Sequence, residues 1–179
     1  MNTYIALIRG INLVGRRSLP MKELKVMCEG AGCRDVRTYI QSGNVIFRSA
    51  ATDVERLSKR LAKMIFTSRG FEPYVLVLTR DELKRAAARN PFPEATANHK
   101  SLHLFFMGQT PKPDLEKLEA VRAKSERFQL VGKTFYLHTP DGFGKSKLAQ
   151  RAERLLGVEA TARNWRTVTT LIEMSRSYR

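Results

Sequence analysis

Residues 36–47 have the sequence VRTYIQSGNVIF, and this stretch decides the fold. Two runs rich in β-branched and aromatic residues, Val36–Ile40 and Val45–Phe47, flank the tripeptide Ser42-Gly43-Asn44. Such runs favour strands, and Gly and Asn tolerate the positive φ angles that tight hairpin turns require. The stretch therefore predicts a β-hairpin, made of the second and third strands of a sheet.

On the N-terminal side of this hairpin, the chain predicts one strand and one helix. Tyr4–Arg9 alternates apolar residues and is bounded by glycines, which is typical of a strand. Apolar residues recur at helical spacing over Met21–Gly30, and Ser18 is the expected N-cap. The strand precedes the helix, so the order up to the hairpin is βαββ.

On the C-terminal side, a second helix and a fourth strand complete the unit. Asp53 is expected to start the helix and Gly70 to end it, with Leu57 and Leu61 on its inward face. The apolar run Pro73–Leu78 then predicts a strand. The first half of the chain thus has the order βαββαβ.

The same order is expected again after a connecting segment. Its predicted elements are a short helix Asp81–Ala88, a strand Leu102–Met107, a helix Asp114–Lys124, a hairpin of Phe128–Val131 and Thr134–His138, a helix Ser146–Leu156, a strand Ala160–Asn164 and a last helix Thr167–Ser175. Two βαββαβ units predict an α+β protein of two consecutive ferredoxin-like (α/β plait) subdomains plus a C-terminal helix. The expected domains are residues 1–80 and 101–179, joined by residues 81–100.

Charge is the one unusual feature of the composition. The 179 residues carry 32 Lys and Arg against 17 Asp and Glu, a formal net charge of +15. The excess is spread along the chain, with +9 in residues 1–90 and +6 in residues 91–179. It predicts an anionic partner, either nucleic acid or a phosphorylated small molecule. No apolar run is long enough for a membrane helix, so we expect a soluble cytoplasmic protein and no membrane partner.

Polar residues at predicted strand ends are the candidate site in the first half. Arg9 closes the first predicted strand and Asn12 follows it, and Gln41, Ser42 and Asn44 form the hairpin tip. Side chains at strand ends can converge on one pocket, which makes all five candidate ligand-binding residues. Turn formation explains Asn44 equally well.

The second half supplies two further candidate segments. Lys145 and Ser146 follow a glycine-containing loop at the start of a helix, a context in which backbone N–H groups bind phosphate or carboxylate. The alternative is a tight turn that merely begins the helix. The other candidate residues are Arg163, Asn164, Trp165 and Arg166. Arginine can clamp an oxyanion and tryptophan can stack on a base, whereas the alternative is an anchor between the two domains.

The sequence assigns no catalytic residue, no metal and no cofactor. The three histidines, His99, His103 and His138, lack the spacing of metal ligands. Cys28 and Cys33 are expected to be reduced, buried thiols. No carboxylate pair has a spacing that indicates acid/base catalysis.

Five short motifs together resemble one bacterial family. They are Arg9–Asn12, Tyr39–Val45, Asn90–Phe92, Gly144–Leu148 and Thr161–Thr167. Over residues 2–174 the chain resembles the domain-of-unknown-function family 1697, DUF1697. The resemblance implies two α/β plait subdomains and no established activity. Where that family often has a second Gly after the first-strand motif, this chain has Gly15-Arg16, which adds a positive charge beside Arg9.

Three functional hypotheses are therefore open. The first is a nucleic-acid-binding module, although the Gly-aromatic signature of RNA-binding proteins with this fold is absent from residues 44–47. The second is a sensor for a nucleotide or phosphorylated metabolite, or an enzyme acting on one. The third is an interaction or assembly protein without a ligand, in which the polar motifs fix the domain interface.

Overall fold

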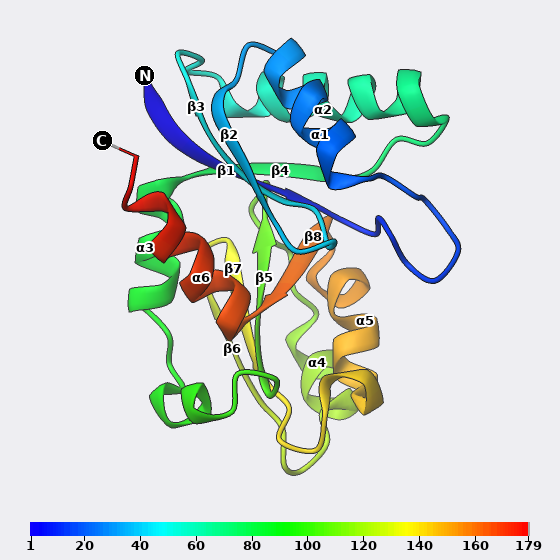
Figure 1. The fold of residues 1–179 in the computed structure, drawn as a ribbon. Helices are drawn as coiled ribbons and strands as arrows, with labels where there is room; N and C mark the ends of the chain where they lie inside the picture. Colours follow the sequence, from blue (N-terminus) through cyan, green and yellow to red (C-terminus); the bar gives the residue numbers. More distant parts are fainter. Residues whose placement is uncertain (179) are drawn as a thin grey trace. The chain divides into compact units, whose positions relative to one another are not determined.

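The computed structural model describes residues 1–178 and contains two four-stranded sheets with their helices (Figure 1). The first elements are β1 (Asn2–Ile8), α1 (Met21–Gly30), β2 (Arg34–Tyr39), β3 (Asn44–Ser49), α2 (Val54–Arg69), β4 (Val75–Thr79) and α3 (Arg80–Ala88). The later ones are η1 (Pro93–Ala97), β5 (Leu102–Met107), α4 (Leu115–Val121), β6 (Arg127–Val131), β7 (Thr134–His138), η2 (Phe143–Lys145), α5 (Lys147–Leu156), β8 (Ala160–Asn164) and α6 (Trp165–Ser175). The chain divides into two compact units: Met1–Arg85 with residues 170–178, and Ala86–Thr169.

The first unit has the strand order β2-β3-β1-β4, and all its pairs are antiparallel. Its central strand β1 pairs with β3 through Leu7 opposite Asn44, and with β4 through Ile8 opposite Val75. The end of β1 therefore lies at the same sheet edge as the starts of β3 and β4. This edge carries the predicted residues of the first half.

Both helices of the first unit begin where the sequence predicts, but only α2 has the predicted N-cap. The Asp53 carboxylate accepts a hydrogen bond from the Arg56 N–H at 2.9 Å, and Gly70 ends α2 at φ 75°. The Ser18 prediction is wrong, because α1 begins at Met21 with Pro20 as N-cap and no side-chain cap. Ser18 stands too far ahead of Met21 to reach the first N–H groups, and the fixed φ of proline starts that helix instead.

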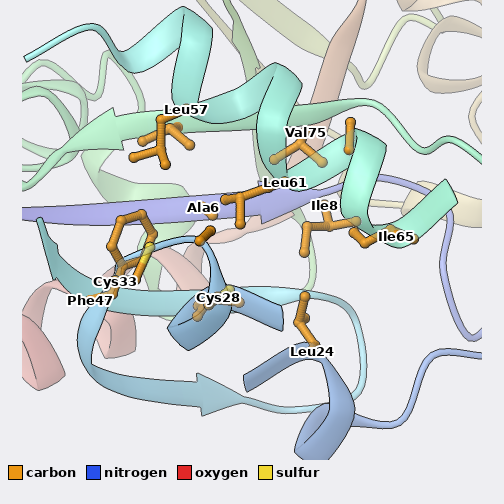
Figure 2. Close-up of a cluster of buried hydrophobic side chains, with 14 of the residues drawn as sticks. Ala6, Ile8, Leu24, Cys28, Cys33, Phe47, Leu57, Leu61, Ile65 and Val75 are labelled. Carbon is orange, nitrogen blue, oxygen red and sulfur yellow. The ribbon is translucent and has the colours of Figure 1, made fainter. Parts of the chain in front are cut away.

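The core of the first unit lies between one face of its sheet and helices α1 and α2 (Figure 2). Labelled in Figure 2 are its residues Ala6, Ile8, Leu24, Cys28, Cys33, Phe47, Leu57, Leu61, Ile65 and Val75. Both thiols are free and buried. Burial raises the pKa of Cys28 and raises that of Cys33 to about 11, so both stay protonated and unreactive near neutral pH.

The second unit repeats the topology, with strand order β6-β7-β5-β8 and antiparallel pairs throughout. Phe105, Phe135 and Leu137 on one sheet face pack with buried residues of α4 and α5, including Leu118 and Leu148. The prediction of two ferredoxin-like subdomains plus a C-terminal helix is therefore confirmed.

Helix α4 ends earlier than the predicted Lys124, at Val121. The cause is a compact turn: the buried Glu126 carboxylate accepts a hydrogen bond from the Ala123 N–H at 3.0 Å, and Arg122 Nη1 donates to the Glu126 carbonyl at 2.9 Å. These hydrogen bonds engage the Ala123 N–H and the Glu126 carbonyl, which a longer helix would have bonded within itself.

Helix α6 begins two residues before the predicted Thr167, because the Asn164 side chain caps it by accepting the Thr167 N–H at 2.9 Å. Beyond α6 the chain belongs to the first unit. There Tyr178 Oη donates to the Asp35 carbonyl at 2.6 Å, and Arg80 Nη1 donates to the Tyr178 carbonyl.

None of the helices formed by residues 1–178 combines the length and the apolar character needed to cross a bilayer.

Candidate functional site

The five predicted residues of the first half meet at one edge of the first sheet. Backbone hydrogen bonds join the three segments there: the Ile8 N–H donates to the Gly43 carbonyl at 2.8 Å, and the Arg9 N–H donates to the Tyr74 carbonyl at 2.9 Å. Arg9, Asn12, Gln41, Ser42 and Asn44 thus stand on neighbouring segments, as strand order alone requires.

Asn12 uses its amide to shape this edge. Its Nδ2 donates to the carbonyls of Leu19 and Gln41 at 2.9 and 2.8 Å, and its Oδ1 accepts the Leu19 N–H at 2.7 Å. Asn12 itself has φ 55°, which asparagine tolerates better than most residues. The side chain therefore ties the β1–α1 loop to the hairpin tip, and little of it remains for a ligand.

Asn44 has a related structural task. The residue is fully buried, and its Nδ2 donates to the Tyr39 carbonyl at 3.1 Å and to the exposed Ser42 Oγ at 2.9 Å. The expectation that Asn44 supplies a positive φ is wrong: Ile40 and Gly43 do so, at 48° and 78°. Asn44 is the first residue of β3, and its buried side chain stabilises the β2–β3 turn through these hydrogen bonds.

Two arginines at this edge lie over aromatic rings. The Arg9 guanidinium carbon is 5.3 Å from the centroid of the Tyr74 ring, and that of Arg17 is 5.9 Å from the centroid of Phe71. Exposed Arg16 belongs to the same loop. We call Arg9, Arg16, Arg17, Phe71 and Tyr74 the arginine edge. The sequence analysis did not identify Phe71 and Tyr74 as site residues. The available signal was their position just before β4, which pairs with the end of β1.

The loop that carries Arg16 and Arg17 is a small hairpin. The Asn12 N–H donates to the Arg17 carbonyl at 3.1 Å, and Leu13 and Arg16 form a bridge across the tip. The tip side chains Leu13 and Val14 are 61% and 102% exposed. The loop thus presents two exposed apolar side chains next to Arg16 and Arg17.

The predicted residues of the second half share one edge of the second sheet. His103, near the start of β5, pairs with Leu137 on one side and with Asn164 on the other. The loop after β7, with Lys145 and Ser146, and the segment after β8 therefore flank the same strand start. Because the first five residues belong to the other unit, the candidates form two groups, each at its own sheet edge.

Within the second group, only some side chains are exposed to solvent. Ser146 is buried as the N-cap of α5, accepting the Ala149 N–H at 2.9 Å, and the Asn164 side chain is the cap of α6. Exposed cations remain at Lys145 and Arg166, and Trp165 is half-buried as the first residue of α6.

Arg163 is buried on β8, at 8% exposure. Its Nη1 donates to Thr161 Oγ1 and to the Ala162 carbonyl, both at 2.8 Å. Burial lowers its pKa to about 10, so the guanidinium stays charged at neutral pH. These contacts show a structural use of Arg163.

His103 packs against the loop that leads to Lys145. Its ring stacks on Phe143 with centroids 3.7 Å apart, and its buried Nδ1 has no hydrogen-bond partner. Burial lowers the pKa of His103 to about 4. Among residues 1–178, no three His, Cys, Asp or Glu side chains form a group that could hold a metal ion.

The neutral His103 predicts an acid-sensitive fold. Its native pKa lies below the unfolded value of about 6.5, so the unfolded chain binds the proton first as pH falls, and stability is lost from about pH 6.5 toward pH 4. We expect the wild type to lose about 1 to 2 kcal/mol more than His103→Phe between pH 7 and pH 5, measured by urea unfolding. Equal losses in both proteins would contradict a buried neutral imidazole.

Comparison with known proteins gives one family and one fold. A family model described as "Protein of unknown function (DUF1697)" matches residues 1–136. The solved structure of the conserved bacterial protein SP0830 from Streptococcus pneumoniae is similar, with a TM-score of 0.75 and 22% identity over 98% of this chain and 99% of that one. At that identity the likeness shows the fold alone. No curated protein matches the chain.

Proposed function

Since this chain belongs to DUF1697, a family described only as proteins of unknown function, we propose its function from its own side chains. It binds an anionic ligand, and the ligand that the arginine edge favours is single-stranded nucleic acid. The net charge of +15 supports an anionic partner in general. The arrangement of the edge supports the more specific choice.

The observation that carries the proposal is the pairing of guanidinium groups with rings. Arg9 lies 5.3 Å from the Tyr74 centroid and Arg17 lies 5.9 Å from that of Phe71. Proteins that bind single strands combine cations for the phosphates with planar groups for the bases, and both are offered here by neighbouring residues. A duplex hides its base faces, so this combination favours a single strand.

The surrounding loop adds to this surface. Arg16 supplies a third cation, and exposed Leu13 and Val14 supply apolar contact for a base. Asn12 and Asn44, with their backbone hydrogen bonds, keep the loop and the hairpin tip in one arrangement before a ligand arrives. Such preorganisation reduces the entropy lost on binding.

A second candidate function is binding of a phosphorylated small molecule at the edge of the second sheet. Exposed Lys145 and Arg166 flank the start of β5 there and could each contact a phosphate oxygen. The Ser146 hydroxyl is already engaged, because its oxygen accepts the Ala149 N–H of α5. This second candidate function therefore depends on the two cations.

The test is a fluorescence-anisotropy titration of a labelled single-stranded oligonucleotide of about 12 nucleotides. With about three phosphates contacted, the logarithm of affinity should fall with the logarithm of salt with a slope of about −2, or about tenfold to twentyfold between 50 and 200 mM. Binding that ignores salt, or that a sugar phosphate abolishes at equal concentration, would contradict a nucleic-acid ligand and favour the second candidate.

A further inference from the structure

A groove of about 680 Å³ runs between α1 and α2 on the first unit. It shares no residue with the arginine edge. Its lining is Lys22, Glu23, Val26 and Met27 from α1 and Arg60, Lys63, Met64, Thr67 and Ser68 from α2. Both helices direct their other faces, with Leu24, Cys28, Leu61 and Ile65, toward the sheet (Figure 2).

The floor of this α1–α2 groove is apolar and contains two methionines. Met27 and Met64 are half-buried and pack against the core, whereas Val26 is 65% exposed. The helices approach closely at one end, where a Cβ on Gly30 would lie 3.3 Å from Met64 Cε. Methionine side chains adapt to different apolar partners, which is why they are common at binding surfaces.

The rim of the groove is positively charged. Lys22, Arg60 and Lys63 have no acidic partner among the described residues, whereas Glu23, the one acidic lining residue, is paired with Arg69. The groove therefore presents three uncompensated cations around an apolar floor.

We propose that the α1–α2 groove binds an acidic amphipathic helix of a partner protein. An apolar stripe with i, i+3, i+4 and i+7 spacing would lie on Val26, Met27 and Met64, and flanking carboxylates would face Lys22, Arg60 and Lys63. A second copy of this chain fits less well, because two chains of net charge +15 repel each other. A nucleic acid fits less well too, because the floor has no aromatic ring for its bases.

The test uses labelled model peptides of about 14 residues made of Leu, Ala and Glu, with Leu at helical spacing. Fluorescence anisotropy on the full-length protein should show saturable binding of this acidic peptide. A peptide with Lys in place of Glu, and an acidic peptide with Ser in place of Leu, should bind at least about tenfold more weakly.

Substitutions place the binding in the groove. Val26→Glu and Lys63→Glu should each weaken binding of the acidic Leu peptide about fivefold or more, and both change side chains at the surface, so the protein stays folded. The matched controls Leu115→Glu and Arg56→Glu lie outside the groove lining and should change it less than about twofold.

Three results would overturn the proposal. The first is equal binding of the acidic peptide without Leu, which would mean attraction by charge alone. The second is unchanged affinity in both groove variants. The third is dimerisation, seen by sedimentation and lost in Val26→Glu, which would make a second copy the occupant. If the protein fails to bind the oligonucleotide, these peptide-binding and sedimentation measurements still test the groove. The reason is that the arginine edge and the groove have no residue in common.

Discussion

Replacing Arg9 and Arg17 together by alanine should weaken binding of a single-stranded oligonucleotide by about thirtyfold to a hundredfold, or about 2 to 3 kcal/mol. Each guanidinium lies against a ring, so its removal takes away one cation and one planar group from the site. The salt slope should decrease by about 1.4, because about two phosphate contacts are lost. Anisotropy titrations at three salt concentrations measure both quantities.

Two matched variants separate this effect from loss of charge. Arg151→Ala with Arg154→Ala removes the same charge from exposed positions on α5 and should change affinity less than about threefold. Arg9→Lys with Arg17→Lys keeps the charge but loses the planar group, so the salt slope should remain while affinity decreases. If the α5 variant weakens binding as much as the edge variant, net charge and not the arginine edge determines affinity.

Gly43→Ala should destabilise the protein by about 3 kcal/mol or more. Gly43 has φ 78°, and an added Cβ would lie 2.9 Å from both Ile8 Cβ and Ile11 Cδ1 and 3.0 Å from the Ile8 carbonyl oxygen. Ile8 is a fully buried residue of the central strand, whose N–H is bonded to the Gly43 carbonyl, so neither side can move easily. Urea unfolding of the variant and the wild type gives the difference.

Gly132→Ala is the control for the backbone conformation. Gly132 has φ 59° in the β6–β7 turn, with nothing within 4 Å of the position of its Cβ. The free energy of unfolding of this variant should decrease by only about 1 to 2 kcal/mol, which is the cost of placing a side chain on a left-handed backbone. Equal destabilisation by the two substitutions would show that the contact with Ile8 has no energetic weight.

The order of the elements could be predicted because their boundaries are encoded locally. Asp53 and Gly70 mark the two ends of α2 in sequence as they do in structure. The boundaries that were wrong depend on side chains outside the element. Helix α4 ends early because Glu126 closes a turn beyond it, and α6 begins early because the Asn164 side chain caps it.

The position of the candidate residues could be predicted better than their roles. Because β1 and β3 are antiparallel neighbours, the residues after β1 and the residues before β3 lie at the same edge of the sheet. The predicted order of the strands already implies this placement. The role of Asn12 depends on the Gln41 carbonyl, 29 residues away, and that of Asn44 depends on being buried. Tyr74 and Phe71 are an ordinary aromatic pair in the sequence, and only the structure places them under Arg9 and Arg17.

The most direct test of the central claim is photo-crosslinking of a bound single-stranded oligonucleotide, followed by mass spectrometry of the crosslinked peptides. Tyr74 and Phe71 are at the arginine edge, and aromatic rings that stack on bases crosslink efficiently to them. We predict crosslinks in residues 9–17 and 71–74, and their loss in Arg9→Ala with Arg17→Ala. Crosslinks confined to residues 139–166, or spread evenly over the basic surface, would contradict the account.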